Sequence, residues 1–129
     1  MLLAEMKRKF RLRKSADFQR VLKEGRSWAH PLIVLSALPN DLEHSRFGFS
    51  VSRKIGKAVV RNRVKRLMRE ATRLRLESIK EGWDMVFTAR QPIREADFHQ
   101  VDRAIEDLLR RAGLLKGESG ETEGGKGEA

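Results

Sequence analysis

The spacing of apolar residues divides the chain into short segments of two kinds. Over residues 16–24, 58–78 and 98–112, apolar side chains recur every three or four positions, which places them on one face of an α-helix. A glycine follows each of these segments within a few residues, as is common at helix ends. Ser15 and Asp97 stand where the first and last helices would need an N-terminal cap. The pattern therefore predicts three helices, with Ser15 and Asp97 as caps.

Shorter apolar segments between the helices predict strands. Residues 32–38 form an apolar run between two prolines, and residues 84–90 form another before a Gln-Pro pair. Residues 47–52 alternate, so that one face is large and apolar and the other carries Gly48, Ser50 and Ser52. Residues 27–30 could add a separate short strand. The order αβββαβα is typical of an α+β fold, a small α/β sandwich in which helices pack against a sheet.

Composition bounds the domain organisation. The chain has 129 residues, of which 40% are hydrophobic, and this suits a single domain over residues 1–115. Residues 116–129 contain five glycines, four glutamates and no large apolar side chain, so this tail is expected to be disordered. The absence of cysteine excludes disulfides and cysteine-ligated zinc. No apolar run is long enough to cross a membrane, and a signal sequence is not expected at the N-terminus.

Positive charge is concentrated in two stretches. The formal net charge is +10 and the isoelectric point is about 10.7. Residues 46–75 contain eleven lysines and arginines and one acid, Glu70, while residues 7–14, the basic arm, contain six basic side chains around Phe10 and Leu12. So much like charge repels itself unless a polyanion neutralises it. Nucleic acid is the favoured polyanion, because its phosphates are dense and its binding releases condensed counterions.

The basic side chains of the 58–78 helix are expected to lie apart from its apolar face. A rotation of about 100° per residue places four of them within roughly 120° on another side; they are Arg61, Lys65, Arg69 and Arg73. A solvated helix face is the ordinary interpretation, but arginine outnumbers lysine here and its planar fork suits phosphate. Asn62 stands among these arginines and could hydrogen-bond an RNA backbone or a base edge. Contact with RNA or DNA is therefore favoured over a passive face.

No catalytic or metal-binding constellation is visible in the sequence. His30, His44 and His99 lie in three different segments without ligand spacing. Gly56-Lys57 lacks the first glycine and the hydroxyl residue of a phosphate-binding loop, although it leads into a helix N-terminus that attracts phosphate. Catalytic residues and protein-bound metals are therefore not expected. Phe18, beside the basic arm, is interpreted equally well as core packing or as a platform for an RNA base.

The stretch from Phe47 to Arg73 carries a motif long enough to compare with known families. It reads FGFSVSRKIGKAVVRNRVKRLMREATR. It resembles the signature of the bacterial ribonuclease P protein component, the small basic subunit of the RNA enzyme that removes the 5′ leader from precursor tRNA. Ser50–Gly56 and Ala58–Glu70 match the strand and helix patterns of that family, and an upstream pattern matches from Arg11 to Val21. The resemblance covers about residues 7–113.

The resemblance implies a fold, two RNA partners and which of the two subunits supplies the catalytic groups. The implied fold has a mixed central sheet, three helices and a left-handed crossover that links parallel strands through the Arg61–Arg63 helix. The implied role is that of a subunit of a cytoplasmic ribonucleoprotein endonuclease, with the ribonuclease P RNA subunit and precursor tRNA as partners and neither DNA nor membrane. The catalytic groups would belong to the RNA, as would the Mg²⁺ that the holoenzyme needs, so no cofactor is expected on the protein alone.

The resemblance also implies which residues contact each RNA. Those expected to bind the RNA subunit are Arg53, Lys54, Lys57, Arg61, Asn62, Arg63, Lys65, Arg66 and Arg69. Those expected to bind the leader are Arg11, Arg13, Lys14, Phe18, Val34, Ser50 and Ser52. Leu22 and Ser36 stand where many members of that family have aromatic residues, which reduces the capacity for stacking.

Two other classes of protein fit the composition. A ribosomal protein can have the same size and charge. A sequence-specific DNA-binding protein would need a helix-turn-helix spacing, which a single basic helix between two strands does not supply. Co-purification of a structured RNA of non-ribosomal type would separate these classes.

Overall fold

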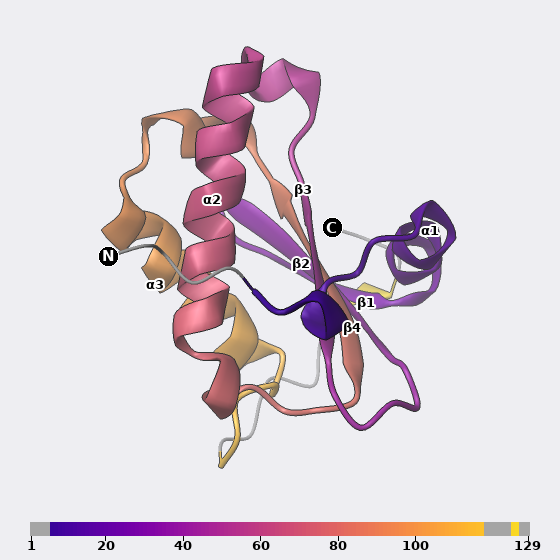
Figure 1. Ribbon diagram of the computed structural model, residues 1–129. Coiled ribbons are helices and arrows are strands. Elements are labelled where there is room, and N and C mark those ends of the chain that lie inside the picture. Colours follow the sequence, from indigo (N-terminus) through magenta and orange to yellow (C-terminus); the bar gives the residue numbers. More distant parts are fainter. Residues whose placement is uncertain (1–5, 118–124, 127–129) are drawn as a thin grey trace.

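The computed structural model describes residues 6–117 and 125–126, which form a sheet with helices on both faces (Figure 1). The helices are α1 (Ser15–Glu24), α2 (Ala58–Leu74) and α3 (Phe98–Arg111). The strands are β1 (Arg26–Ala29), β2 (Ile33–Pro39), β3 (Arg46–Ser50), β4 (Trp83–Ala89) and β5 (Gly125–Lys126). The predicted order αβββαβα is confirmed, and β5 follows it.

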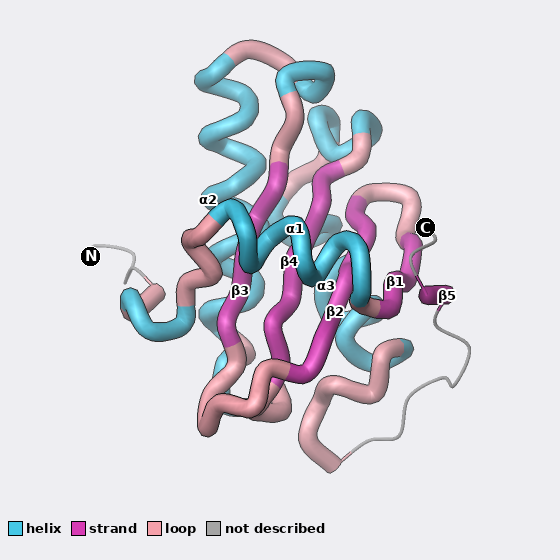
Figure 2. The backbone as a smooth tube through the Cα atoms, turned by 90° about the vertical axis from the view of Figure 1, so that its right-hand side faces the viewer, coloured by secondary structure: helices cyan, strands magenta, loops and turns pink. Residues whose placement is uncertain are grey.

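The sheet is mixed, and its strand order differs from the chain order. The strands lie in the order β3-β4-β2-β1-β5, with β3 parallel to β4 and every other pair antiparallel. Since β3 and β4 run in the same direction, α2 crosses back between them. Figure 2 shows both strands running upward, β4 to the right of β3, and α2 on the far side of the sheet. This geometry confirms the left-handed crossover, against the general preference for right-handed connections.

Alternation along the strands separates two cores. The main core lies between the sheet and helices α2 and α3, while α1 covers part of the opposite face (Figure 1). The smaller core beneath α1 is built from Leu12, Val21 and Val86. Phe47 and Phe49 face the main core, whereas Gly48 faces α1. The two unlike faces predicted for this strand are therefore confirmed.

Helix α2 is shorter than predicted. The buried residues of its apolar face include Val64, Met68 and Ala71, as the helical spacing requires. The helix ends at Leu74 instead of Ser78, and a 3₁₀ turn follows over Leu76–Ser78. The tighter turn redirects the chain so that Ile79 is buried and bridges to the segment after α3. Leu74, predicted on the apolar face, is the last residue of α2 and is 58% exposed.

The two predicted helix caps differ in outcome. Asp97 accepts a hydrogen bond from the Gln100 N–H at 2.9 Å, and the Gln100 side chain accepts one from the Asp97 N–H at 2.9 Å. This capping box confirms the cap of α3. Ser15 is instead the first residue of α1, and Lys14 holds the cap position without a side-chain capping bond. The prediction was wrong because the chain just before Lys14 is bound to β3 through Leu12, which determines where the helix begins.

Most of the C-terminal segment lies outside the described residues. The prediction that residues 116–129 are disordered therefore falls outside them as well. Among the described residues, the Lys116 ammonium donates to the Glu81 carboxylate at 2.9 Å. Gly125–Lys126 pairs with β1 as β5, with Gly125 opposite Ser27. This short strand adds to the sheet predicted from the apolar pattern.

A buried carboxylate, Asp84, joins α1 to the sheet. It accepts two hydrogen bonds from the Arg46 guanidinium, at 2.9 and 2.7 Å, and one from the Asn40 amide at 2.9 Å. Two residues of α1 complete the network, since Asp17 lies 3.6 Å from Arg46 and Arg20 lies 3.6 Å from Asp84. The hydrogen bond from Arg46 to Asp84 raises the pKa of Arg46, although burial acts in the opposite direction. The two-pronged contact between Arg46 and Asp84 therefore holds the start of β3 to the start of β4.

Asp84→Ala should lower the free energy of unfolding by about 3 kcal/mol, because it leaves a half-buried guanidinium without its acceptor. Urea denaturation followed by circular dichroism measures the change. The control is Glu106→Ala, which removes an exposed pair with Arg110 at 3.0 Å and a longer contact with Arg75 at 3.8 Å, while Arg75 keeps its hydrogen bonds to Asp102. That variant should cost less than about 1 kcal/mol. Equal losses in the two variants would show that the Asp84 network does not stabilise the fold.

Candidate nucleic-acid interface

The chain enters α2 through a tight basic turn. Arg53–Ile55 forms a 3₁₀ turn whose last residue is buried, and Gly56 follows with a φ of 157°, a conformation that favours glycine. Lys57 occupies the N-terminal cap position of α2 but makes no side-chain capping bond. The positive end of the helix dipole therefore has no side-chain cap. Three exposed cations surround it, namely Arg53, Lys54 and Lys57.

Four basic side chains of α2 make no hydrogen bond or ion pair within the described part of the chain. They are Arg61, Lys65, Arg66 and Arg69. Arg66 is exposed and the other three are half-buried. Arg73, predicted on the same face, instead donates to the Glu70 carboxylate at 3.0 and 2.6 Å, which raises the pKa of Arg73. The cationic surface suited to phosphate is therefore narrower than the sequence pattern predicted.

Arg63 makes a structural contact that the sequence did not reveal. Its Nη2 donates to the backbone oxygen of Ala96 at 2.8 Å, which joins α2 to the turn before α3. The side chain of its neighbour Asn62 is exposed and makes no hydrogen bond among the described residues. Within the Arg-Asn-Arg motif, Arg61 and Asn62 are thus available to a ligand, while Arg63 also stabilises the fold.

The basic arm is bound to the edge of the sheet. Arg8–Phe10 forms a 3₁₀ turn, so the arm is not extended along its whole length. The N–H of Leu12 donates to the backbone oxygen of Phe47 at 2.9 Å, and the Leu12 side chain is buried. These contacts give the arm a fixed place, with Arg13 and Lys14 exposed on it.

Phe18 packs on the sheet opposite a glycine. The ring is half-buried, and a Cβ added at Gly48 would lie 2.4 Å from Phe18 Cζ. The ring also contacts the small core beneath α1. Phe18 therefore fills the space over Gly48, and the remaining surface of its ring is accessible.

A row of small side chains next to this position is only partly covered. The strands β3, β4, β2 and β1 each contribute one residue to it in register, namely Ser50, Thr88, Val34 and Ala29. All four are half-buried, because α1 crosses the sheet nearer to Gly48 (Figure 2). Ser52 is exposed beyond the end of β3. The sequence indicated Val34 and Ser50 but missed Thr88, because only the strand register places it between them.

A hollow of about 210 Å³ brings the two predicted groups of RNA-binding residues together. Its lining comes from the basic arm, α1, β3 and α2, and its charged members are Arg11, Arg13, Lys65 and Arg69. Phe18 and Gly48 form part of the same wall. Lys65 and Arg69, which the resemblance assigned to the RNA subunit, therefore line the same hollow as Phe18, which it assigned to the leader.

A second hollow, of about 420 Å³, follows the basic arm. Its basic lining residues are Arg8, Lys9, Arg11, Arg13, Lys14 and Arg46. Arg11 and Arg13 line both hollows. The two hollows thus form one continuous basic surface, and Lys14 belongs to the part of it farther from α2.

The side chains gathered on this surface are suited to binding an anion and a base. The described residues contain no group of three or more His, Cys, Asp or Glu that could hold a metal ion. His30 accepts a hydrogen bond from the Leu32 N–H at 3.0 Å, His44 lies edge-on to Phe10, and His99 is exposed. Among the described helices, none is long and apolar enough to span a membrane.

Comparison with known proteins shows the family to which the chain belongs. A family model described as Ribonuclease P matches residues 6–113. The ribonuclease P protein component of Roseiflexus castenholzii is 47% identical over 118 residues, which cover 91% of this chain and 97% of the relative. The ribonuclease P protein component of Clostridioides difficile is 45% identical over 104 residues, which cover 80% of this chain and 91% of the relative.

Solved structures agree with these relatives. The RNase P protein of Staphylococcus aureus superposes with a TM-score of 0.77 at 36% identity, covering 83% of this chain and 98% of that one. The RNase P protein of Thermotoga maritima gives a TM-score of 0.73 at 36% identity, covering 78% of this chain and 96% of that one. Matched in sequence over residues 6–113 and in fold to these structures, the chain belongs to the ribonuclease P family.

Proposed function

We propose that this chain binds the ribonuclease P RNA subunit through α2 and holds the single-stranded 5′ leader of precursor tRNA beside Phe18. In this way it assists the endonucleolytic removal of the leader in the cytoplasm. The catalytic groups and the Mg²⁺ belong to the RNA in this proposal. Membership of the family favours this role over a ribosomal protein or a DNA-binding protein.

The observation that carries the proposal is the hollow between Phe18 and α2. Lys65 and Arg69 line it and make no hydrogen bond or ion pair within the described chain. Phe18 adds an aromatic surface at the same place. A single strand presents phosphates along its backbone and unstacked bases beside it, and these cations and this ring complement both.

The RNA subunit would bind the opposite, N-terminal end of α2. There the dipole and three exposed cations, Arg53, Lys54 and Lys57, present a positive surface with Arg66 on the next turns. Arg61, Asn62 and Arg63 lie between this end and the hollow along the helix. The helix would thus contact both RNAs and set the distance between them.

Without RNA, the protein should not cleave precursor tRNA, because no residue of the chain is proposed to act as a catalyst. Added to ribonuclease P RNA, it should lower the Mg²⁺ concentration for half-maximal cleavage, since its cations share the neutralisation of crowded phosphates. Cleavage rates over a Mg²⁺ titration, with and without protein, measure both effects. Robust cleavage by protein freed of RNA would contradict the proposal.

Arg61→Ala and Arg66→Ala should weaken binding of the RNA subunit without lowering stability, since neither side chain has a partner in the described structure. Each lost phosphate contact should flatten the slope of log affinity against log salt by roughly 0.7 to 0.9. Arg63→Ala should also destabilise the fold by about 1 kcal/mol, because the Ala96 oxygen loses its donor. The packing control is Val64→Ala, which should cost about 1–3 kcal/mol in stability and keep the wild-type slope. A wild-type slope in Arg61→Ala and Arg66→Ala would refute the assignment of α2.

Phe18→Ala should weaken binding of precursor tRNA by up to roughly a hundredfold and affect mature tRNA much less, because only the precursor carries a leader to stack on the ring. Gly48→Ala adds a methyl group 2.4 Å from Phe18 Cζ and must displace the ring. It should therefore weaken leader binding in the wild type but add little to Phe18→Ala. Fluorescence anisotropy with both tRNAs, together with thermal melts, measures these effects. Equal weakening for both tRNAs with a lowered Tm would leave Phe18 as a packing residue.

A further inference from the structure

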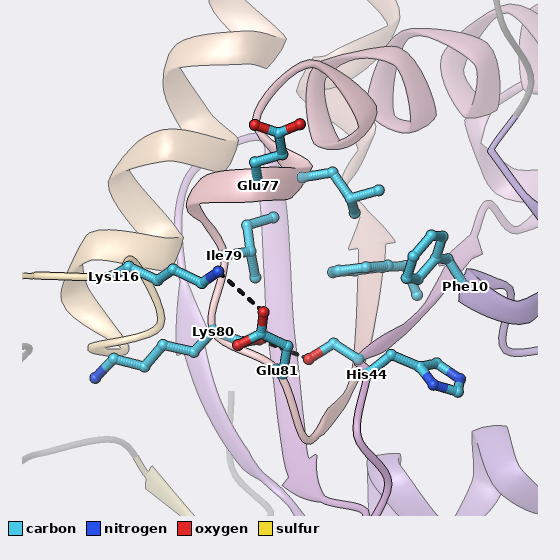
Figure 3. A pocket seen from close by; sticks show the side chains of 10 residues that line it. Phe10, His44, Glu77, Ile79, Lys80, Glu81 and Lys116 are labelled. Atoms are coloured by element: carbon cyan, nitrogen blue, oxygen red, sulfur yellow. Dashed lines mark hydrogen bonds and ion pairs between the residues drawn. The ribbon is translucent and has the colours of Figure 1, made fainter.

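A larger cavity lies on another part of the basic arm, and none of the proposed leader-binding residues lines it. Its volume is about 430 Å³, within the range of sites that hold small organic groups. Figure 3 shows it surrounded by side chains from the arm, from the chain just before β3 and from the segment after α2. Its apolar walls are Phe10, Phe47, Leu76 and Ile79. We refer to it as the Phe10 cavity.

Aromatic rings form one wall of the Phe10 cavity. Phe10 is half-buried and lies edge-on to His44, with 5.8 Å between the ring centroids (Figure 3). The Lys9 ammonium lies 5.0 Å from the centroid of Phe10. Phe47, on the same wall, is buried. A flat ring could therefore be bound between aromatic and aliphatic side chains, with a cation close by.

The polar groups at the cavity rim include two carboxylates. Glu81 accepts a hydrogen bond from Lys116 at 2.9 Å, and this bond lowers the pKa of Glu81, so the group is ionised at neutral pH. Glu77 is exposed and has no partner among the described residues. The Ser45 hydroxyl is already engaged, since it donates to the Lys80 oxygen at 2.6 Å. Lys80 also lines the cavity, but its ammonium points away from Phe10 (Figure 3). The carboxylates accept hydrogen bonds and repel phosphate, so this rim favours a ligand group that donates N–H.

The groups that attract phosphate lie just outside the cavity. Lys7, Arg8 and Lys9 are exposed on the adjoining arm. His44 lines both the Phe10 cavity and the basic hollow along the arm, so the two are contiguous. A nucleic-acid backbone that follows the arm can therefore direct a base into the cavity while its phosphates stay on the cations.

We propose that the Phe10 cavity is a second single-stranded RNA site, which takes one unstacked base that carries an exocyclic amino group. The base packs against Phe10, its amino group donates to Glu77 or Glu81, and the adjoining phosphates contact Lys7, Arg8 and Lys9. Adenine, cytosine and guanine have such an amino group, whereas uracil presents a carbonyl oxygen to the carboxylates instead. The inference shares with the proposed function only the premise that the protein binds single-stranded RNA.

Binding of labelled octacytidylate and octauridylate to the full-length protein, followed by fluorescence anisotropy, tests this site. Cytosine and uracil are similar in size but differ in the amino group, so the wild type should bind the cytidine oligomer about fivefold more tightly. Phe10→Leu keeps an apolar wall but removes the ring and should weaken octacytidylate binding about tenfold. The matched control is Phe98→Leu, at a half-buried phenylalanine of α3 that does not line the cavity, and it should change binding less than about twofold.

Glu77→Gln and Glu81→Gln test the polar end, since an amide can also donate to the uracil oxygen. The double variant should bind the two oligomers with a ratio of affinities of about one, so that the preference for cytidine is lost. Phe18→Ala should weaken both oligomers equally and leave the preference intact, which separates this site from the leader groove. Equal binding of the two oligomers by the wild type, or equal effects of Phe10→Leu and Phe98→Leu, would overturn the second site alone. Failure of the wild type to bind either oligomer would overturn both proposals.

Discussion

The parallel pairing of β3 with β4 determines where the basic surface lies. Strands that run in the same direction need a crossover, and in this chain the crossover is α2, its most basic helix. Because β3 is at the edge of the sheet, its outer side is open to the chain that precedes α1. The hydrogen bond from Leu12 to Phe47 uses this opening and brings the basic arm beside α2. An antiparallel hairpin of β3 and β4 would need only a tight turn and would leave no place for such a helix.

The groove beside Phe18 is held by contacts on two sides. On one side, the ring packs on Gly48 and on the small core beneath α1. On the other, Asp84 joins the sheet to α1 through Arg46 and Arg20. A binding surface fixed in this way loses little conformational entropy when a strand binds, which favours affinity without many direct contacts. The placement of α1 is thus as important to the proposed function as the cations themselves.

Much of the fold could be predicted from local sequence, because periodicity, caps and turns act over a few residues. Asp97 and the two unlike faces of β3 are examples. The errors arose where distant segments decide the outcome. The start of α1 depends on the pairing of Leu12 with β3, and the end of α2 depends on the turn that leads to the buried Ile79.

The candidate site, like the fold, could be predicted only in part. Its residue types could be predicted from the basic motif and its resemblance to a family, but their grouping could not. Strand register places Thr88 between Ser50 and Val34, and the crossover brings Arg69 to the hollow that Phe18 lines. The network around Asp84 had only a weak sequence signal, a single acid in an otherwise apolar strand.

The open outer edge of β3 bears on whether two copies of the protein can associate. Among the described residues, the outward pairing of this strand is confined to its contact with Arg11 and Leu12, so most of its outward backbone groups face no strand. An open edge of this kind invites a second copy to add its own strand. Here Arg13, Lys65 and Arg69 gather around that edge, and two copies brought together there would repel each other. The positive charges that attract phosphate to this surface therefore also oppose self-association at the β3 edge, as long as no polyanion neutralises them.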